Sequence, residues 1–189
     1  NPKDSDILKI VGKTLYDRKA YSEAAKYLAL LGNDAPQDYM IMHSEACFNS
    51  NNFKKAAEVL EKLKADTKIK GTIVFQIYKM LAEAYEKDSN SVKASTAYGD
   101  YLTLPGVRDP DAAYKQAFFM ENSNVEDARK LYEANTKNYP ADYRNFLRLG
   151  LIYSAKKESL HKAVTMLTKV TDLAASVPAV WIELGRVYG

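Results

Sequence analysis

Hydrophobic residues recur at helical spacing along almost the whole chain. Between Ile7 and Pro36 the apolar and small positions are three and four residues apart, so each set lies on one face of a helix. This stretch predicts a helix, a tight turn and a second helix. The same pattern returns about every 34 residues, so the sequence predicts a repeated helix-turn-helix unit and an all-α fold.

An alanine followed four residues later by a larger apolar residue marks each copy. The pairs are Ala24 and Leu28, Ala56 and Leu60, Ala94 and Tyr98, Ala128 and Tyr132, and Ala163 and Leu167. About twelve residues before each alanine stands a residue that is small in four of the five copies. We expect a small side chain at this position to let the paired helix approach closely. These residues are Gly12, Ser44, Ala82, Gln116 and Gly150.

The pattern divides the chain into five full repeats and half of a sixth. Because the units of such an array pack only on their neighbours, we expect residues 1–189 to form a single domain. Polar residues suited to turns separate the two helices of each unit, and the Pro105–Pro110 stretch interrupts the chain between repeats three and four. The expected repeats are 5–36, 37–70, 71–106, 109–140 and 141–177, with the half repeat at 178–189.

The repeat resembles the tetratricopeptide repeat. The motif of Trp, two residues, Leu-Gly, two residues and Tyr is complete at Trp181, Leu184, Gly185 and Tyr188. The later Ala, aromatic and Pro positions stand at Ala128, Tyr132 and Pro140 in repeat four, and similar residues stand in repeat one. The resemblance covers nearly the whole chain and implies a right-handed α-solenoid. Only the first helix of the sixth repeat is present, so we expect the parent protein to continue.

Charge and composition narrow the class of partner. The chain has 27 Lys plus Arg against 24 Asp plus Glu, a net charge of +3, which argues against nucleic acid or an anionic membrane as the partner. No apolar run is long enough for a membrane helix. The first residue is Asn1, and the Lys-rich, Asn-rich composition with a single cysteine suits a bacterial protein, with an exported or periplasmic location favoured over the cytoplasm.

No pattern of catalytic, metal-binding or cofactor-binding residues is present. The histidines, His43 and His161, belong to different repeats, and Cys47 falls at a packing position, where we expect a small buried thiol. Carboxylate pairs such as Glu126 and Asp127 are expected to be solvated charges on a helix surface. We therefore expect a protein that is not an enzyme and that binds no metal or cofactor.

Tyrosine is abundant, with fourteen residues, and tyrosines beside basic residues can stack on nucleic-acid bases. Most of them fall on positions that pack one helix against the next, so we assign these to the core. The core set includes Tyr21, Tyr85, Tyr98, Tyr132, Tyr153 and Tyr188. Tyr16 and Tyr114 fit that pattern less well and are candidates for a surface.

The resemblance also implies where a partner binds, because the first helices of such repeats line a concave groove that takes a peptide or helix of another protein. Carried onto this chain, the candidate contacts are Ile41, Met42, Phe48, Lys79, Met80, Tyr114, Arg144 and Arg148. The family's clamp for the acidic tails of chaperones does not fit, because its asparagines are missing. Arg144 and Arg148 lie one helical turn apart and are expected to be able to hold a carboxylate.

Two functions follow as hypotheses. The first is a protein-interaction scaffold without activity of its own, which binds a partner peptide or helix in the groove. The alternative is a structural spacer or oligomerisation module of a larger protein, which self-associates through the uncovered end at Trp181, Leu184 and Tyr188. The sequence leaves open whether an enzyme domain lies outside these residues.

Overall fold

A computed structural model describes residues 4–32 and 35–189, and this part of the chain consists of helices, turns and loops without strands. The chain forms two compact units, the first ending at Leu104 and the second running from Pro105 to Gly189. The all-α fold that the periodicity predicts is confirmed. None of the described helices combines the length and apolar character needed to cross a membrane.

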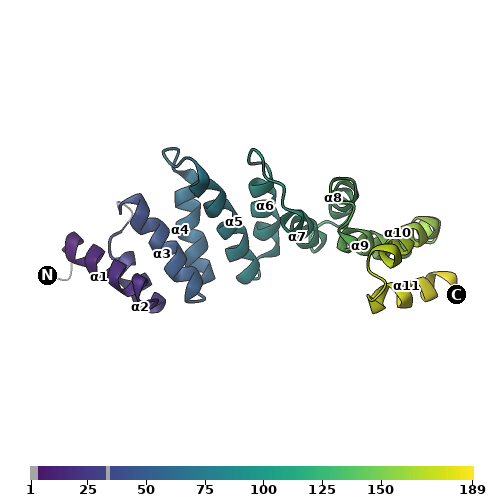
Figure 1. The fold of residues 1–189 in the computed structure, drawn as a ribbon, viewed down its shortest axis with the longest axis horizontal. Coiled ribbons are helices and arrows are strands. Elements are labelled where there is room, and N and C mark those ends of the chain that lie inside the picture. Colours follow the sequence, from purple (N-terminus) through teal and green to yellow (C-terminus); the bar gives the residue numbers. More distant parts are fainter. Residues whose placement is uncertain (1–3, 33–34) are drawn as a thin grey trace. The chain divides into compact units, whose positions relative to one another are not determined.

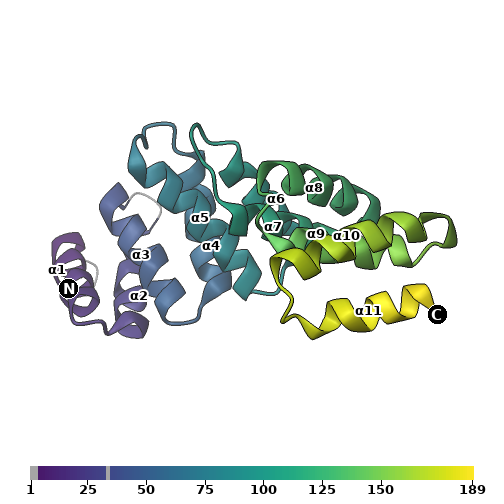
Figure 2. The same cartoon turned by 45° about the vertical axis from the view of Figure 1, so that its right-hand side comes forward.

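The first unit contains three helical hairpins, which are arranged one after another (Figures 1 and 2). Helix α1 pairs with α2, α3 with α4 and α5 with α6, while α2 also packs on α3 and α4 on α5. The second helix of each of the first two hairpins therefore also contacts the first helix of the following hairpin. The helices are α1 (Ser5–Asp17), α2 (Tyr21–Ala29), α3 (Gln37–Asn49), α4 (Phe53–Ala65), α5 (Thr72–Lys87) and α6 (Ser91–Leu102).

The second unit contains two hairpins and a final helix (Figure 2). Helix α7 pairs with α8 and α9 with α10, α8 packs on α9, and α11 packs mainly on α10. A short 3-10 turn, η1 (Lys157–Ser159), lies between α9 and α10. The helices are α7 (Pro110–Glu121), α8 (Val125–Asn138), α9 (Tyr143–Ser154), α10 (Leu160–Leu173) and α11 (Pro178–Tyr188).

Local sequence signals explain where the helices begin. Asp109 caps α7 by accepting a hydrogen bond from the Ala112 N–H at 3.0 Å, and Pro110 occupies the first turn, where its missing N–H costs nothing. In the first three hairpins the turn contains one residue with a left-handed backbone, at Lys19, Asn51 and Ser89. A residue with this backbone conformation lets the chain reverse its direction within a few residues. It therefore allows the short connections between helices that the sequence predicts.

The alanines that mark the repeats form the centre of each hairpin. All five alanines are fully buried, and the larger residue four positions later is at most 2% exposed in every copy. The glycines confirm the expected close approach of the paired helices. A Cβ atom added to Gly12 would lie 2.7 Å from Leu28 Cδ2, and one added to Gly150 would lie 2.5 Å from Leu167 Cδ2.

Buried tyrosines pack between helices and donate their hydroxyl groups to glutamates. Tyr132 Oη donates to Glu121 at 3.0 Å and Tyr85 Oη donates to Glu61 at 2.8 Å. Equivalent hydrogen bonds join Tyr16 to Glu45, Tyr98 to Glu86, and Tyr153 to Glu133. The hydroxyl of a buried tyrosine needs such an acceptor, and the glutamates supply it at the helix surface.

The final helix departs from the expected core assignment. Tyr188, which the repeat pattern places in the core, is 73% exposed, and none of the helices in residues 4–32 and 35–189 covers its side chain. Leu184 was expected on the uncovered face, but it is half-buried against the core formed by Phe146, Leu167 and Val180. The large apolar side chains that α11 exposes are those of Trp181, Ile182 and Tyr188.

Candidate functional site

Three of the predicted partner contacts and one further aromatic residue lie together on one surface of the second unit, which we call the α7–α9 face. It consists of Tyr114 and Phe118 from α7 and Arg144 and Arg148 from α9. Positions four apart on a helix lie one above the other, so the two aromatic rings form one row and the two guanidinium groups form another. The structure therefore brings three predicted residues together and adds Phe118, which is not among the predicted contacts.

Arg144 is held from three sides. Its guanidinium lies over the Tyr114 ring, with Cζ 4.4 Å from the ring centroid, within the range of a cation–π contact. Its Nε and Nη2 donate to the two oxygens of Asp142, at 2.9 and 2.8 Å, and Nη1 donates to Asp111 at 2.7 Å. Asp142 also caps α9, since it accepts from the Arg144 N–H at 3.1 Å.

Arg148 is held in a similar way by α7. Its Nε donates to Glu121 Oε2 at 3.0 Å, and Nη2 donates to the other oxygen of the same carboxylate. Glu121 Oε2 also accepts from the Tyr132 hydroxyl, which ties the surface pair to the buried core. The guanidinium Cζ lies 5.7 Å from the Phe118 ring centroid. Bidentate pairing fixes the orientation of a guanidinium better than a single contact does.

These contacts change what the arginines offer to a partner. Burial raises the pKa of the Asp111 carboxyl, but the hydrogen bonds and charges of Arg144 and Lys115 outweigh it and lower the pKa overall. Glu121 likewise raises the pKa of Arg148 against the opposing effect of burial. Both arginines, which were expected to be able to hold a partner carboxylate, already bind carboxylates of this chain.

The exposed part of the α7–α9 face is aromatic. Phe118 is 39% exposed and stacks on Tyr114 with their ring centroids 5.8 Å apart. Tyr114 is half-buried and also contacts the core residue Tyr132, with centroids 6.2 Å apart. A four-residue spacing from Tyr114 was the sequence signal that could have identified Phe118.

The remaining candidate contacts lie in the first unit, on α3 and α5. Lys79 is exposed, with its ammonium 5.7 Å from the Tyr101 ring centroid, and Met80 is half-buried. Ile41 and Met42 are half-buried, and Met42 packs on the core of the first two hairpins. Phe48 packs edge-to-face on Phe53 of α4 at 5.3 Å, so part of its surface serves the hairpin.

Side chains with potential chemistry occupy structural positions. Cys47 is 1% exposed, and burial raises the pKa of its thiol to about 11, as expected for a structural cysteine. His43 is half-buried on α3, where burial and the charges of Lys55 and Lys62 lower its pKa to about 4. His161 lies exposed on α10 in the other unit. Within residues 4–32 and 35–189, no group of His, Cys, Asp and Glu has the arrangement of a metal site.

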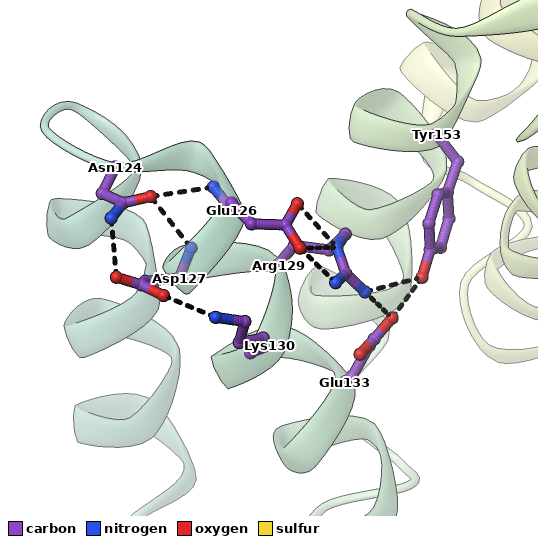
Figure 3. Close-up of polar contacts among 7 residues, drawn as sticks. All are labelled: Asn124, Glu126, Asp127, Arg129, Lys130, Glu133 and Tyr153. Atoms are coloured by element: carbon purple, nitrogen blue, oxygen red, sulfur yellow. Dashed lines mark hydrogen bonds and ion pairs between the residues drawn. The ribbon is translucent and has the colours of Figure 1, made fainter.

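The carboxylates that might have suggested acid–base chemistry are paired with cations of their own helix (Figure 3). Glu126 binds Arg129, and Asp127 binds Lys130 at 2.9 Å. Asn124 caps the helix by accepting from the N–H groups of both acidic residues at 3.1 Å. These pairs strengthen the first turn of α8, where negative charge is favourable.

The arrangement of successive helical hairpins is the fold of tetratricopeptide-repeat proteins, and solved structures confirm the resemblance. The chain is similar to YrrB, described as a TPR protein with an unusual peptide-binding site, with a TM-score of 0.68 and 17% identity over 98% of this chain and 94% of that one. It is also similar to MamA from strain AMB-1, with a TM-score of 0.67 and 14% identity over 97% of each chain. A MamA structure from Desulfovibrio magneticus RS-1 gives a TM-score of 0.61 and 15% identity, over 92% of this chain and 97% of that one. No protein-family model matches the chain, and none of the curated proteins is similar to it in sequence.

Proposed function

We propose that this chain is a protein-interaction scaffold whose α7–α9 face binds a segment of a partner protein. The observation that carries the proposal is the fixed geometry of Arg144 and Arg148, each held by a carboxylate and by an aromatic ring. A surface side chain ordinarily loses about 0.5–1.5 kcal/mol of conformational freedom when it is immobilised in an interface. In this chain the side chains of Arg144 and Arg148 are already ordered before the partner binds.

The composition of the face also suits a binding surface. Tyr and Arg are over-represented among the residues that contribute most to protein–protein affinity. Phe118 offers an exposed ring beside them. The same fold in YrrB, which is described as having a peptide-binding site, supports a binding role for the surface.

The partner chemistry differs from the acidic segment expected from the sequence. Among the described residues, the hydrogen bonds of Arg144 to Asp111 and Asp142 use three of its five N–H groups, and two remain for a partner. Because the positive charge is already matched, backbone carbonyl oxygens are better partners than carboxylates. We therefore expect an extended segment with an apolar side chain on Phe118 and carbonyl groups facing the arginines.

The candidates in the first unit belong to the same proposal. Ile41, Met42, Phe48, Lys79 and Met80 are on first helices of their hairpins, as Tyr114 is in the second unit. We propose that they form further contacts for a partner, with Met side chains adapting to its shape.

Site-specific cross-linking tests the assignment. A photo-reactive amino acid is placed at Phe118 and, as a matched control, at Val125, which is an apolar residue of α8 that is 50% exposed. In lysate of the source organism, we expect a protein that cross-links from position 118 and not from position 125. The captured segment is then synthesised and its affinity measured by calorimetry.

Variants of the face complete the test. The triple variant Tyr114→Ala, Arg144→Glu, Arg148→Glu should abolish binding of the segment, and the milder Phe118→Ser should weaken it at least about tenfold, because hot-spot truncations commonly cost about 2 kcal/mol or more. Circular dichroism verifies that both variants are folded. Equal cross-linking from positions 118 and 125, or unchanged affinity of a folded Phe118→Ser protein, would refute the proposal.

A second candidate function, self-association through α11, is favoured by the exposed aromatic residues of that helix. Trp181 is 54% exposed, and apart from Gly185, its two neighbours and the nearby backbone of α11, no described atom lies within 4 Å of the place where a Gly185 Cβ would stand. If α11 drives assembly, sedimentation velocity should show mass increasing with concentration, and Trp181→Lys should remove the increase. A monomer at all concentrations would eliminate this candidate.

A further inference from the structure

A cavity of about 370 Å³ lies on a different surface of the second unit, between the second helices of two hairpins. We call it the α8–α10 groove. Leu149, Tyr153 and Met166 give it an apolar floor, and Lys137 of α8 and Lys162 of α10 stand at its rim, together with Glu133. None of the residues that line this groove is a predicted contact or belongs to the α7–α9 face, so the two sites are distinct.

The floor of the groove is rigid. The Tyr153 hydroxyl donates to Glu133, and Arg129 binds Glu133 and also Glu126 on the same helix (Figure 3). Figure 3 shows the Tyr153 ring, from α9, reaching across to the side chains of α8. The negative charge of Glu133 is therefore matched by Arg129, and the position of the ring is fixed.

The rim carries positive charge that the described residues leave unmatched. Lys137 and Lys162 are exposed, and neither forms an ion pair with another residue in the part of the chain that the structure describes. The Lys162 ammonium lies 5.5 Å from the Tyr153 ring centroid, which places its charge beside the floor. In contrast, both arginines of the α7–α9 face have carboxylates of their own.

We propose that the α8–α10 groove docks an acidic segment of a partner protein. A leucine-sized side chain of that segment lies on Leu149, Tyr153 and Met166, and carboxylates on either side of it bind Lys137 and Lys162. Charge complementarity selects an acidic partner, and the apolar floor selects an aliphatic side chain between the charges. The groove would thus let one chain hold a second partner, or a second segment of the same partner.

The methionines provide a direct measurement. The chain contains five, so a protein labelled with ¹³C at the methionine methyl groups gives five NMR signals, of which Met166 reports on the groove. The probe is a five-residue peptide with a central leucine and two acidic residues on each side. We expect a saturable shift of the Met166 signal, with the signals of Met40, Met42 and Met80 in the first unit unchanged.

Matched peptides and variants test the apolar contact with the floor and the charge contacts with the rim separately. Replacing the central leucine by glycine, or the acidic residues by lysine, should abolish the Met166 shift. Lys137→Glu with Lys162→Glu should weaken binding of the acidic peptide roughly tenfold, since each exposed ion pair contributes about 0.2–1 kcal/mol and the reversed charges add repulsion. The control Lys54→Glu with Lys157→Glu makes the same change of net charge at exposed positions that do not line the groove, and should leave the affinity unchanged.

Three outcomes would overturn the proposal. The first is the absence of a saturable Met166 shift with the acidic peptide. The second is an equal shift with the glycine or lysine peptide. The third is an equal shift with inorganic phosphate alone, which would make the groove a simple anion site.

Discussion

Gly150 offers a sharp test of how closely the paired helices approach. In Gly150→Ala the added Cβ would lie 2.5 Å from Leu167 Cδ2 and 2.7 Å from its Cγ, roughly 1 Å inside ordinary van der Waals contact. Leu167 is fully buried, so it cannot move aside without disturbing the core. Overpacking of this kind costs about 1–3 kcal/mol, while exchanging glycine for alanine inside a helix gains about 1 kcal/mol. We therefore expect a net loss of up to about 2 kcal/mol.

Gly185 is the matched control, because it occupies the same position of the repeat. Nothing lies within 4 Å of its added Cβ, so Gly185→Ala should keep the helix gain of up to about 1 kcal/mol without the clash. Urea unfolding followed by circular dichroism measures the loss at Gly150, and amide hydrogen exchange measures the local gain in α11.

A double-mutant cycle identifies the clashing atom. Leu167→Ala alone should cost about 2–5 kcal/mol, but adding Gly150→Ala to it should cost nothing further, because the atoms that clash are gone. If Gly150→Ala stabilises the protein as Gly185→Ala does, or if its cost persists beside Leu167→Ala, then helix proximity does not explain the glycine.

Three further predictions concern buried polar and titratable groups. Cys47, with its pKa raised to about 11 by burial, should resist alkylation at pH 8, where roughly one thiol in a thousand is ionised, and should react in full once urea unfolds the protein. Because burial lowers the pKa of His43 to about 4, the folded state binds fewer protons than the unfolded state between about pH 4 and pH 6.5. Stability should therefore fall as pH drops through that window, by less than the roughly 3 kcal/mol that the full shift corresponds to, because water screens the partly exposed imidazole. The fall should be smaller in His43→Leu, as measured by urea unfolding at each pH. The Asn135 amide donates to the Ala113 carbonyl at 2.9 Å and to the Asn145 side chain at 3.1 Å. Asn135→Ala should therefore lower the free energy of unfolding by about 2–3 kcal/mol. A free energy from thermal unfolding that lies within about 0.5 kcal/mol of the wild-type value would contradict this prediction.

The helices could be predicted from the sequence because their signals are local or periodic. The alanine at the centre of each hairpin must be small, since the paired helix crosses there, and a change such as Ala128 to a larger residue would separate the helices. The same reasoning placed Gly12 and Gly150 correctly. It failed at Tyr188, where the repeat position is the same but none of the described helices covers the side chain.

The pairing of charged side chains could not be predicted in the same way. Arg144 binds Asp111, 33 positions away, and Arg148 binds Glu121, 27 positions away. Both spacings are close to one repeat, but many acidic residues lie at similar distances along the chain. Which of them pairs with an arginine depends on the side-chain directions of two helices in contact, and periodicity does not specify these directions.

The tyrosine–glutamate hydrogen bonds between neighbouring hairpins have a consequence for the order in which hairpins can be assembled. Tyr85 and Tyr153 stand at the same position of their repeats, and each donates to a glutamate five residues after the central alanine of the preceding hairpin. In repeats one and three, the position of the glutamate is occupied by Ala29 and Gly99. The position of the tyrosine in the repeat that follows is then Cys47 and Phe119, respectively, and neither side chain needs an acceptor. A hairpin moved to the wrong neighbour would bury a hydroxyl without a partner, at a cost of about 1–3 kcal/mol. Hairpins built on the same repeat pattern thus carry matched pairs that distinguish one neighbour from another. Exchanging or deleting single repeats should succeed only where both halves of a pair move together.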